Sequence, residues 1–245
     1  MNRNESFPTA SVSSLQIGIA WSSLELSTDD AEEIQVLVSG NEEDVDDLRI
    51  EAADGRLVIE QPAYGLTTHI TMVRWMQIVV RVPRRWKGAV EATTVAGSLR
   101  ARGLTGSDIV LATVSGDLRA SDISAIELRT RTATGALTVI SAGAERFTGR
   151  TVSGALRVEN GDFRAMRLSS ASGGLFLDLD APFDTLDAST VAGDVTLQAP
   201  IAAAVINHRT VTGRLRTGGV SITDEGPAVS VNTVTGDLTV TRKEP

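Results

Sequence analysis

The chain has 245 residues, no cysteine and a net charge of −8 at neutral pH. Positions 1–60 hold 14 acidic and 3 basic residues, and the remainder holds 17 acidic and 20 basic ones. This composition excludes a disulfide framework and a thiolate metal site. It also argues against nucleic acid as a partner, because the electrostatic attraction to phosphate is missing.

The N-terminal residues 1–9 are polar and lack the basic flank and apolar core of a signal peptide. No apolar run reaches the roughly 18 residues that a membrane-spanning helix needs. We therefore expect a cytoplasmic protein without a direct membrane span, or one that a partner tethers to a membrane.

Short runs of alternating apolar and polar residues near the N-terminus predict β-strands with one buried face. The acidic run at 41–47 is expected to be a solvated loop. It could attract a divalent cation, but it lacks the spaced ligands and central glycine of a calcium loop. Asp54-Gly55 lies between two apolar runs and predicts a tight hairpin turn. The predicted strands lie at 15–21, 24–26, 34–38, 48–50 and 57–59.

Residues 70–82 form the most apolar stretch, and Pro83 ends it because proline cannot donate to a strand ladder. A stack of coils needs a covered end, since a bare coil exposes apolar side chains and unpaired strand edges. We therefore predict irregular first coils and an N-terminal cap over 10–87, followed by regular repeats over 88–242 in one continuous domain. All three tryptophans precede those repeats: Trp21, Trp75 and Trp86.

From residue 94 onward the chain repeats one phrase, and its clearest copy is Thr113-Val114-Ser115-Gly116-Asp117-Leu118. The glycines of successive copies are separated by 19, 19, 19, 19, 20, 20 and 23 residues. Self-similarity at a fixed period near 20 predicts a solenoid. The glycines of the copies are Gly97, Gly116, Gly135, Gly154, Gly173, Gly193, Gly213 and Gly236.

Two apolar positions repeat in step with the glycine, one two residues after it and one seven residues before it. Their separation is odd, so an unbroken strand would put them on opposite faces, whereas a corner at the glycine lets both point inward. Each coil is therefore predicted to hold two short strands that stack about 4.8 Å from those of the next coil. The sequence thus predicts an all-β, single-domain parallel β-solenoid, or β-helix, with coils of about 19–20 residues.

The last residues, 241–245, are charged and end in proline, and we expect them to protect the final edge of the stack. On this interpretation Leu238 belongs to the terminal coil. Truncating it is then expected to cost less stability than truncating Leu137 in a middle coil.

The order of these parts resembles a known family. An alternating N-terminal region, an apolar strand ending at Val82-Pro83 and repeats of Thr-Val-Ser-Gly-Asp-Leu are similar to the bacterial β-strand-repeat family of candidate adhesins. This family is a domain of unknown function also called the toast-rack domain, and the resemblance covers about residues 10–242. It implies a single-stranded β-solenoid without established catalytic residues. It also implies a part in envelope-stress sensing, because family members occur with membrane segments of the phage-shock type.

The third position after the glycine is expected to face outward by strand alternation, and it is arginine in four copies. An arginine face could bind an anionic glycan, a phosphate or a lipid headgroup. The alternative is a solvated wall whose arginines are offset by Asp117, Asp122 and Glu127. The candidate ligand-binding face consists of Arg100, Arg119, Arg157 and Arg216. Further arginines near the preceding strand are Arg129, Arg131, Arg150 and Arg209.

Carboxylates directly after the glycine, at Asp117, Asp194 and Asp237, could suggest glycan cleavage. These copies are not adjacent in sequence, so we expect no carboxylate pair, and aspartate beside glycine is ordinary turn chemistry. The two histidines, His69 and His208, are far apart in sequence and have no nearby cysteine or clustered acids to complete a metal site. We interpret His208 as a wall or loop residue.

The segment 72–76, together with Trp86 and its basic neighbours Arg84, Arg85 and Lys87, could lie at a membrane surface. We interpret it instead as part of the first wall of the solenoid.

The sequence holds neither a phosphate-binding glycine loop before a helix nor a nucleophile elbow. We therefore expect no enzyme and no cofactor, but a non-catalytic β-solenoid that acts as a binding or assembly scaffold linked to cell-envelope stress or adhesion. Its partner would be a protein or a second copy that meets the terminal coil or a strand wall, or an anionic glycan. The alternative is a carbohydrate-binding or carbohydrate-acting β-helix protein that uses the outward arginines and aspartates.

Overall fold

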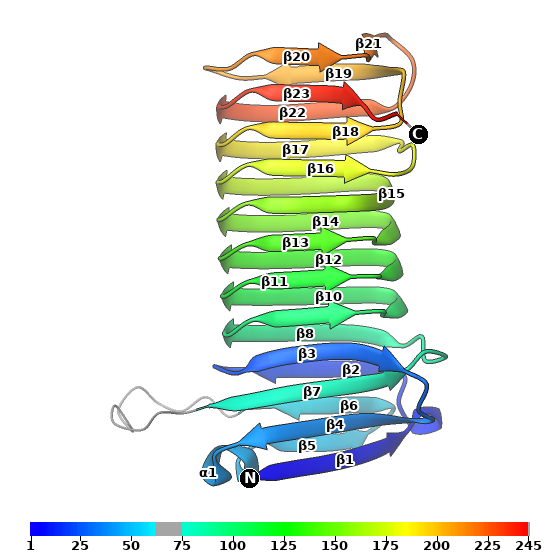
Figure 1. Ribbon diagram of the computed structural model, residues 1–245, viewed down its shortest axis with the longest axis vertical. Coiled ribbons are helices and arrows are strands. Elements are labelled where there is room, and N and C mark those ends of the chain that lie inside the picture. Colours follow the sequence, from blue (N-terminus) through cyan, green and yellow to red (C-terminus); the bar gives the residue numbers. More distant parts are fainter. Residues whose placement is uncertain (62–74, 245) are drawn as a thin grey trace.

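The computed structural model describes residues 1–61 and 75–244. Within these residues the chain forms 23 strands, a 3-10 helix, η1 (Thr9–Ser11), and one five-residue α-helix, α1 (Glu42–Asp46). The prediction of an all-β fold is therefore confirmed. The strands stack into two walls that run along the whole length of the molecule (Figure 1).

We name the two walls by their strands. Because β15 (Leu156–Ser172) runs from wall A into wall B, the described strands form one continuous sheet. In spatial order, wall A consists of β1 (Asn2–Pro8), β4 (Glu33–Gly40), β7 (Met76–Pro83), β3 (Ser23–Asp29), β9 (Leu99–Arg102), β11 (Leu118–Ser121), β13 (Leu137–Ile140), the first part of β15, β16 (Leu175–Leu179), β18 (Val195–Ala199), β23 (Leu238–Arg242) and β20 (Leu215–Gly218). Wall B consists of β5 (Arg49–Ala53), β6 (Arg56–Glu60), β2 (Ser14–Ile19), β8 (Ala89–Ala96), β10 (Thr105–Ser115), β12 (Ser124–Thr134), β14 (Gly143–Ser153), the rest of β15, β17 (Thr185–Ala192), β22 (Ala228–Thr235), β19 (Ala203–Arg209) and β21 (Ser221–Ile222).

Like residues of successive repeats lie beside each other in both walls. Leu118 is the register partner of Leu99 on one side and of Leu137 on the other, in parallel ladders. All three side chains are almost completely buried. Successive residues of a strand point alternately into the core and into solvent. Stacked over many coils, the inward positions form buried columns and the outward positions form exposed columns.

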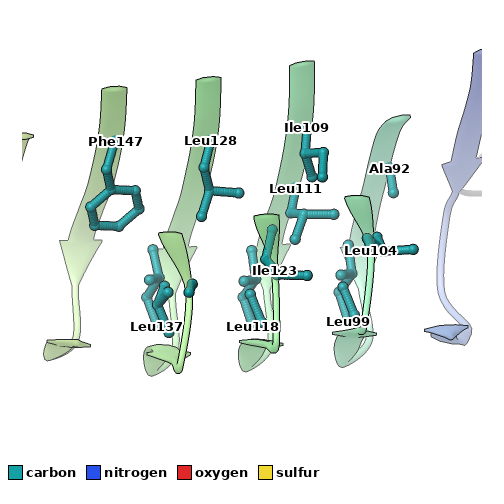
Figure 2. Packing of buried hydrophobic residues seen from close by; sticks show 14 of the residues in the cluster. Ala92, Leu99, Leu104, Ile109, Leu111, Leu118, Ile123, Leu128, Leu137 and Phe147 are labelled. Carbon is teal, nitrogen blue, oxygen red and sulfur yellow. The ribbon is translucent and has the colours of Figure 1, made fainter. Parts of the chain in front are cut away.

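The inward columns of the two walls form a single core. Figure 2 shows Ile109 and Leu111 of wall B pointing toward the side of the core that is filled by Leu118 of wall A and by Ile123, which lies in the turn between β11 and β12. The buried cluster extends over most of the described chain, from residue 12 to residue 240. Stacking of like side chains along the axis thus makes each coil part of one hydrophobic column.

The sheet is mixed, because the N-terminal ladders β1–β4, β4–β7 and β5–β6 are antiparallel. The sheet as a whole is therefore not parallel, and its antiparallel ladders lie in the N-terminal region that was predicted to be an irregular cap. The β5–β6 pairing confirms the hairpin predicted at Asp54-Gly55. β1 was not predicted, since its sequence is mostly polar, as suits an edge strand.

The acidic run predicted as a loop instead contains α1. Acidic side chains in the first turn favour a helix there because they complement the positive end of its dipole. Val45 of α1 and Leu48, two residues after it, are buried, and Arg3 donates from Nη1 to the Leu48 carbonyl oxygen at 2.7 Å. The helix therefore closes the N-terminal end of the core. The division of the chain at residues 87 and 88 stays a prediction.

The order of the coils differs from chain order at both ends of the stack. β2 and β3 lie between β6–β7 and β8–β9, and β22 and β23 lie between β17–β18 and β19–β20. The expectation that the last repeat forms the end of the stack is therefore wrong. The end is the coil made of β19 and β20, which we call the terminal coil (Figure 1).

The C-terminal segment consequently does not protect the final edge. Lys243 donates from its backbone N–H to the Ala199 carbonyl oxygen at 2.8 Å, so it lies beside β18. Its Nζ donates to Asp178 Oδ1 at 2.5 Å and to Asp180 Oδ1 at 2.7 Å. Hydrogen bonds and charge from these two carboxylates raise the pKa of Lys243.

The threonine and glycine of the repeated phrase have separate roles at the corner. Thr94 donates from Oγ1 to the Gly97 carbonyl oxygen at 3.0 Å, and Thr132 donates to that of Gly116 at 3.3 Å. A Cβ on Gly135 would lie 2.4 Å from the Gly116 carbonyl oxygen, and its φ of 132° is one that side chains rarely allow. Glycine therefore permits successive corners to stack in contact.

Replacing Gly135 with alanine should destabilise the protein, since the strained φ alone costs about 1–3 kcal/mol and the new Cβ must displace backbone. Gly18→Ala is the matched control, because a Cβ there has nothing within 4 Å. Denaturant unfolding of both variants measures the difference. Equal stabilities would contradict the close contact at the corner.

Leu137→Ala should cost about 2–5 kcal/mol in the free energy of unfolding, because it leaves a cavity in the middle of the core. Leu238→Ala should cost a similar amount, since β23 is covered on both sides. Leu215→Ala should cost clearly less, because that side chain is 36% exposed in the terminal coil. Urea unfolding measures the loss of stability in each variant. A large loss for Leu215→Ala and a small one for Leu238→Ala would contradict this arrangement and indicate that the last repeat in the sequence forms the end of the stack.

Removal of the Lys243 ammonium group by Lys243→Met should lower stability at neutral pH and have little effect at strongly alkaline pH. The folded pKa is raised, so the stabilisation is complete below the unfolded pKa of about 10.4 and is lost as pH rises through the folded pKa. Thermal melts of both proteins from pH 7 to 11 test this. If the difference in melting temperature between the two proteins did not change with pH, the loss of stability would come from packing rather than from the charge of Lys243.

Candidate ligand-binding face

The four candidate arginines lie on the outer surface of wall A in one column of register partners. Arg100 and Arg119 are direct partners on β9 and β11. Arg157 on β15 follows Thr138 of β13 in the same column, and Arg216 lies at its far end on β20. All four are exposed. Their role in ligand binding stays a prediction.

Arg100 and Arg119 form the part of this column with the least compensated charge. Neighbouring strands lie about 4.8 Å apart, so two guanidinium groups occupy adjacent coils. No carboxylate among the described residues forms an ion pair with either, although Glu25 is the register partner of Arg100 on β3. Both arginines line a groove of about 470 Å³ that also includes Glu25 and the ion pair between Arg102 and Asp122. We call this surface the arginine groove.

The other two candidate arginines already have partners within the protein. The guanidinium carbon of Arg157 lies 4.4 Å from the centre of the Phe176 ring, which is a cation–π distance. Its Nη1 lies 3.5 Å from Glu159 Oε1. Arg216 Nη2 lies 2.9 Å from Asp237 Oδ2. The structure therefore brings the four arginines onto one face but leaves only two of them for an external anion.

Wall B carries a second pair of adjacent arginines, Arg131 and Arg150, which are register partners on β12 and β14. Arg129, on the same wall, contacts Glu127 at 2.7 Å, and this hydrogen-bonded guanidinium lowers the pKa of Glu127. The groove beside Arg150 has a volume of about 350 Å³ and is lined largely by serine, asparagine and an ion pair between Arg167 and Asp187. Wall B is therefore a matched surface with which the arginine groove can be compared.

The aspartates that follow the glycines form a ladder between coils. Asp117 Oδ1 accepts a hydrogen bond from the Ala136 N–H at 2.9 Å. Asp194 Oδ1 accepts from the Asp237 N–H at 2.8 Å, and Asp237 Oδ1 accepts from the Arg214 N–H at 2.8 Å. Each carboxylate thus satisfies a backbone donor of the next corner.

One expectation about these aspartates is wrong. Asp194 and Asp237 lie in neighbouring coils, because β23 stacks directly on β18. Their proximity arises from the inserted last repeat, and both carboxylates bind backbone N–H groups. This arrangement explains the repeated Gly-Asp as a structural pairing between coils rather than as a carboxylate pair for glycan cleavage.

The remaining sequence candidates are separate from this face. His208 lies in β19 at an inward position, and His69 lies outside the described residues. No group of three or more histidine, aspartate or glutamate side chains within the described part of the chain could hold a metal ion.

Trp75 and Trp86 do not lie on one exposed surface. Residues 72–74 lie outside the described residues, and Trp75 is 55% exposed just before β7. Trp86 is buried beyond the other end of β7, where its Nε1 donates to the Val12 carbonyl oxygen at 2.7 Å. No described helix is long and apolar enough to cross a membrane.

Sequence reasoning missed the terminal coil and the aspartate ladder. The single irregular spacing, 23 residues between Gly213 and Gly236, is the sequence signal for the first. Residues 219–227 provide the extra length that carries the chain past its neighbours, so that the last repeat inserts beneath the previous one. The signal for the ladder is the aspartate that recurs directly after the glycine.

Comparison with known proteins identifies a matching family model and solved structures of similar fold. Residues 12–241 match the family model Toastrack DUF4097. A crystal structure of a candidate adhesin from Bacteroides fragilis is 12% identical, has a TM-score of 0.64 and covers 99% of this chain and 96% of its own. One from Parabacteroides distasonis is 12% identical, has a TM-score of 0.61 and covers 99% and 97%.

A search of curated proteins found no significant match. The two structural likenesses lie at low identity and show the shared fold alone. The family model, in contrast, spans nearly the whole chain, and the residues it matches include all of the repeated corners described above. The chain is therefore a member of the Toastrack DUF4097 family.

Proposed function

We propose that the protein is a non-catalytic binding scaffold, and that the arginine groove on wall A is the surface that takes its ligand, an anionic glycan. The observation that carries the proposal is that Arg100 and Arg119 are held in register on adjacent coils, form no ion pair among the described residues and both line one groove. The wall B pair Arg131 and Arg150 also forms no ion pair among these residues, but only Arg150 lines the groove described on that wall. Guanidinium groups suit this task because their planar forks match carboxylate and sulfate groups in two-point contacts.

The fold itself supports a scaffold role. We interpret it as a parallel β-solenoid with coils of about 19–20 residues, on which side chains recur at the strand spacing. Such a ladder holds charged groups at fixed intervals, and a rigid array loses little entropy when a repeating polymer binds. The candidate adhesins of the same fold fit a role in attachment.

A non-catalytic role agrees with the engagement of the candidate carboxylates. Asp117, Asp194 and Asp237 each accept a backbone hydrogen bond from the next coil. Glycoside hydrolysis needs one carboxyl group as acid and another free to act as base or nucleophile. We therefore favour glycan binding over glycan cleavage.

The cellular setting belongs to the proposal as well. A link to cell-envelope stress or adhesion, with a partner that tethers a cytoplasmic chain to the membrane, fits a scaffold that carries a ligand face. Fractionation of cells that express the tagged full chain, with and without detergent, tests the location directly.

Binding of heparin, used as a sulfated glycan probe, should weaken at least about tenfold in the double variant Arg100→Ala and Arg119→Ala, because two charge-assisted contacts are lost. The matched control is Arg131→Ala with Arg150→Ala on wall B, which should retain the affinity. Isothermal titration calorimetry at low and moderate salt gives both values.

Three results would overturn the proposal: no heparin binding by the unmodified protein, an equal loss in the wall B control, or tighter binding to vesicles with anionic phospholipid than to heparin. Inorganic phosphate serves as the small-anion comparison. Release of shortened glycan during incubation would instead support the carbohydrate-acting alternative.

A further inference from the structure

The two ends of the stack are built differently. At the N-terminal end, α1 lies beside the ends of β4 and β5 (Figure 1), and its Val45 is buried in the core. The edge strands there carry charges in short-range pairs, with Arg3 and Glu5 on β1 at 2.6 Å and Arg49 and Glu51 on β5 at 2.5 Å. Charged side chains on an edge discourage further strand pairing. This end is therefore closed to stacking.

The terminal coil at the opposite end leaves its apolar columns incomplete. Leu215 is 36% exposed, whereas its register partner Leu238 is fully buried. Ile206 is only partly buried, although Val229, its partner on β22, is fully buried. Val211, at the corner between the two strands, is 81% exposed, whereas the valines at the same corner position of inner coils are 46% to 55% exposed. Apolar surface at this end thus lacks the neighbour that it has in every inner coil.

The backbone edges of the terminal coil are also unpaired over part of their length. Val205 donates to the Pro227 carbonyl oxygen, so alternation directs the N–H and C=O groups of Ile206 and His208 away from β22. The Arg214 carbonyl oxygen accepts a hydrogen bond from the Leu238 N–H. By alternation, the N–H and C=O groups of Leu215 and Thr217 therefore point away from β23.

The neighbour that β19 has on this side covers only its beginning. β21 pairs with β19 at residues 203 and 204 and extends no further. Beyond this point His208 occupies an inward position, and its buried Nε2 has no hydrogen-bond partner among the described residues. This coil therefore has unpaired backbone groups and an incompletely covered core, and one more layer of strands would satisfy both.

We infer that the terminal coil binds the terminal coil of a second copy, tail to tail about a twofold axis. Rotation about an axis perpendicular to the walls would place residues 206–209 of β19, which β21 leaves uncovered, against the same residues of the partner, and β20 against β20, each pair antiparallel. The unpaired N–H and C=O groups would then meet their counterparts, and the two cores would join. A surface that pairs with itself in this way gives a closed dimer.

Charge placement favours the antiparallel arrangement. Asp224 and Glu225 are exposed in the turn that follows β21, near the beginning of β19, and Arg209 is exposed at the end of β19. Antiparallel pairing brings the acidic turn of one copy toward Arg209 of the other. Arg216, on the outer face of β20, is already neutralised by Asp237. Head-to-tail stacking would instead bring this edge against α1 and the charged strands β1 and β5.

The expected affinity is moderate. The cross-section of the terminal coil, strands of seven and four residues set about 10 Å apart, corresponds to on the order of 500 Å² buried per copy. Interfaces of this size are at the low end for stable complexes. We therefore expect dissociation constants in the micromolar range, and the experiment must cover concentrations up to about 1 mM.

Sedimentation equilibrium of the full chain should show a monomer–dimer equilibrium that Thr217→Pro weakens at least about tenfold. Proline removes an N–H that points away from β23, so the protomer itself loses no ladder hydrogen bond. Thr217→Val keeps this N–H and should dimerise like the unmodified protein. Circular dichroism and thermal melts check that each variant is folded.

An independent readout uses the absence of cysteine from the chain. In the protein with Thr217→Cys as its single cysteine, oxidation should yield a covalent dimer, because the twofold axis brings the two copies of this residue together. The control is Val114→Cys, a similarly exposed position, 48% exposed, on a middle coil. It should remain largely monomeric after oxidation.

Three outcomes would overturn the inference. The first is a monomer at every concentration, and the second is a dimer that Thr217→Pro leaves unchanged. The third is a series of larger species growing with concentration, which would indicate head-to-tail association. Heparin binding through the arginine groove does not depend on the terminal coil, so either proposal can fail without the other.

Discussion

The structure depends on the contact between successive corners, where the backbone of one glycine lies directly against the carbonyl oxygen of the glycine before it. At Gly135 the space for a Cβ is occupied by the Gly116 carbonyl oxygen at 2.4 Å. This close approach sets the strand spacing and holds both walls in register. Leucine therefore stacks on leucine in wall A, threonine hydroxyls reach the corner carbonyls, and aspartates reach the N–H groups of the next coil.

A structure built from stacked layers must deal with its two ends, because the inner layers satisfy one another and the outer ones do not. In this protein the two ends of the stack are covered to different extents. The N-terminal end combines antiparallel strands, paired charges and a short helix that covers the core. The other end has the two-residue strand β21 over part of β19 and leaves β20 uncovered. This difference is why we place self-association at the terminal coil.

The outer surfaces follow from the same register. Because each exposed position repeats at the strand spacing, two arginines in neighbouring repeats become an adjacent pair of charges, as at Arg100 and Arg119. Whether such a pair is available to a ligand depends on the residues next to it. Arg157 lies over Phe176 and Arg216 pairs with Asp237, so identical repeat positions have different chemical environments.

The sequence by itself determined the all-β class, the corner at each glycine, the inward columns and the outward direction of the four arginines. These features depend on local periodicity, which a single chain displays directly. Only the tertiary structure decided the order of the coils. β22 and β23 lie beneath the terminal coil because they pair with the edges of strands that are far away in the sequence. It also decided that Asp194 and Asp237 are neighbours, that the acidic run near Val45 covers one end, and that Leu215 rather than Leu238 lies at the other. Register between distant strands arises from complementary edges and burial, and these interactions form only when the whole stack is assembled.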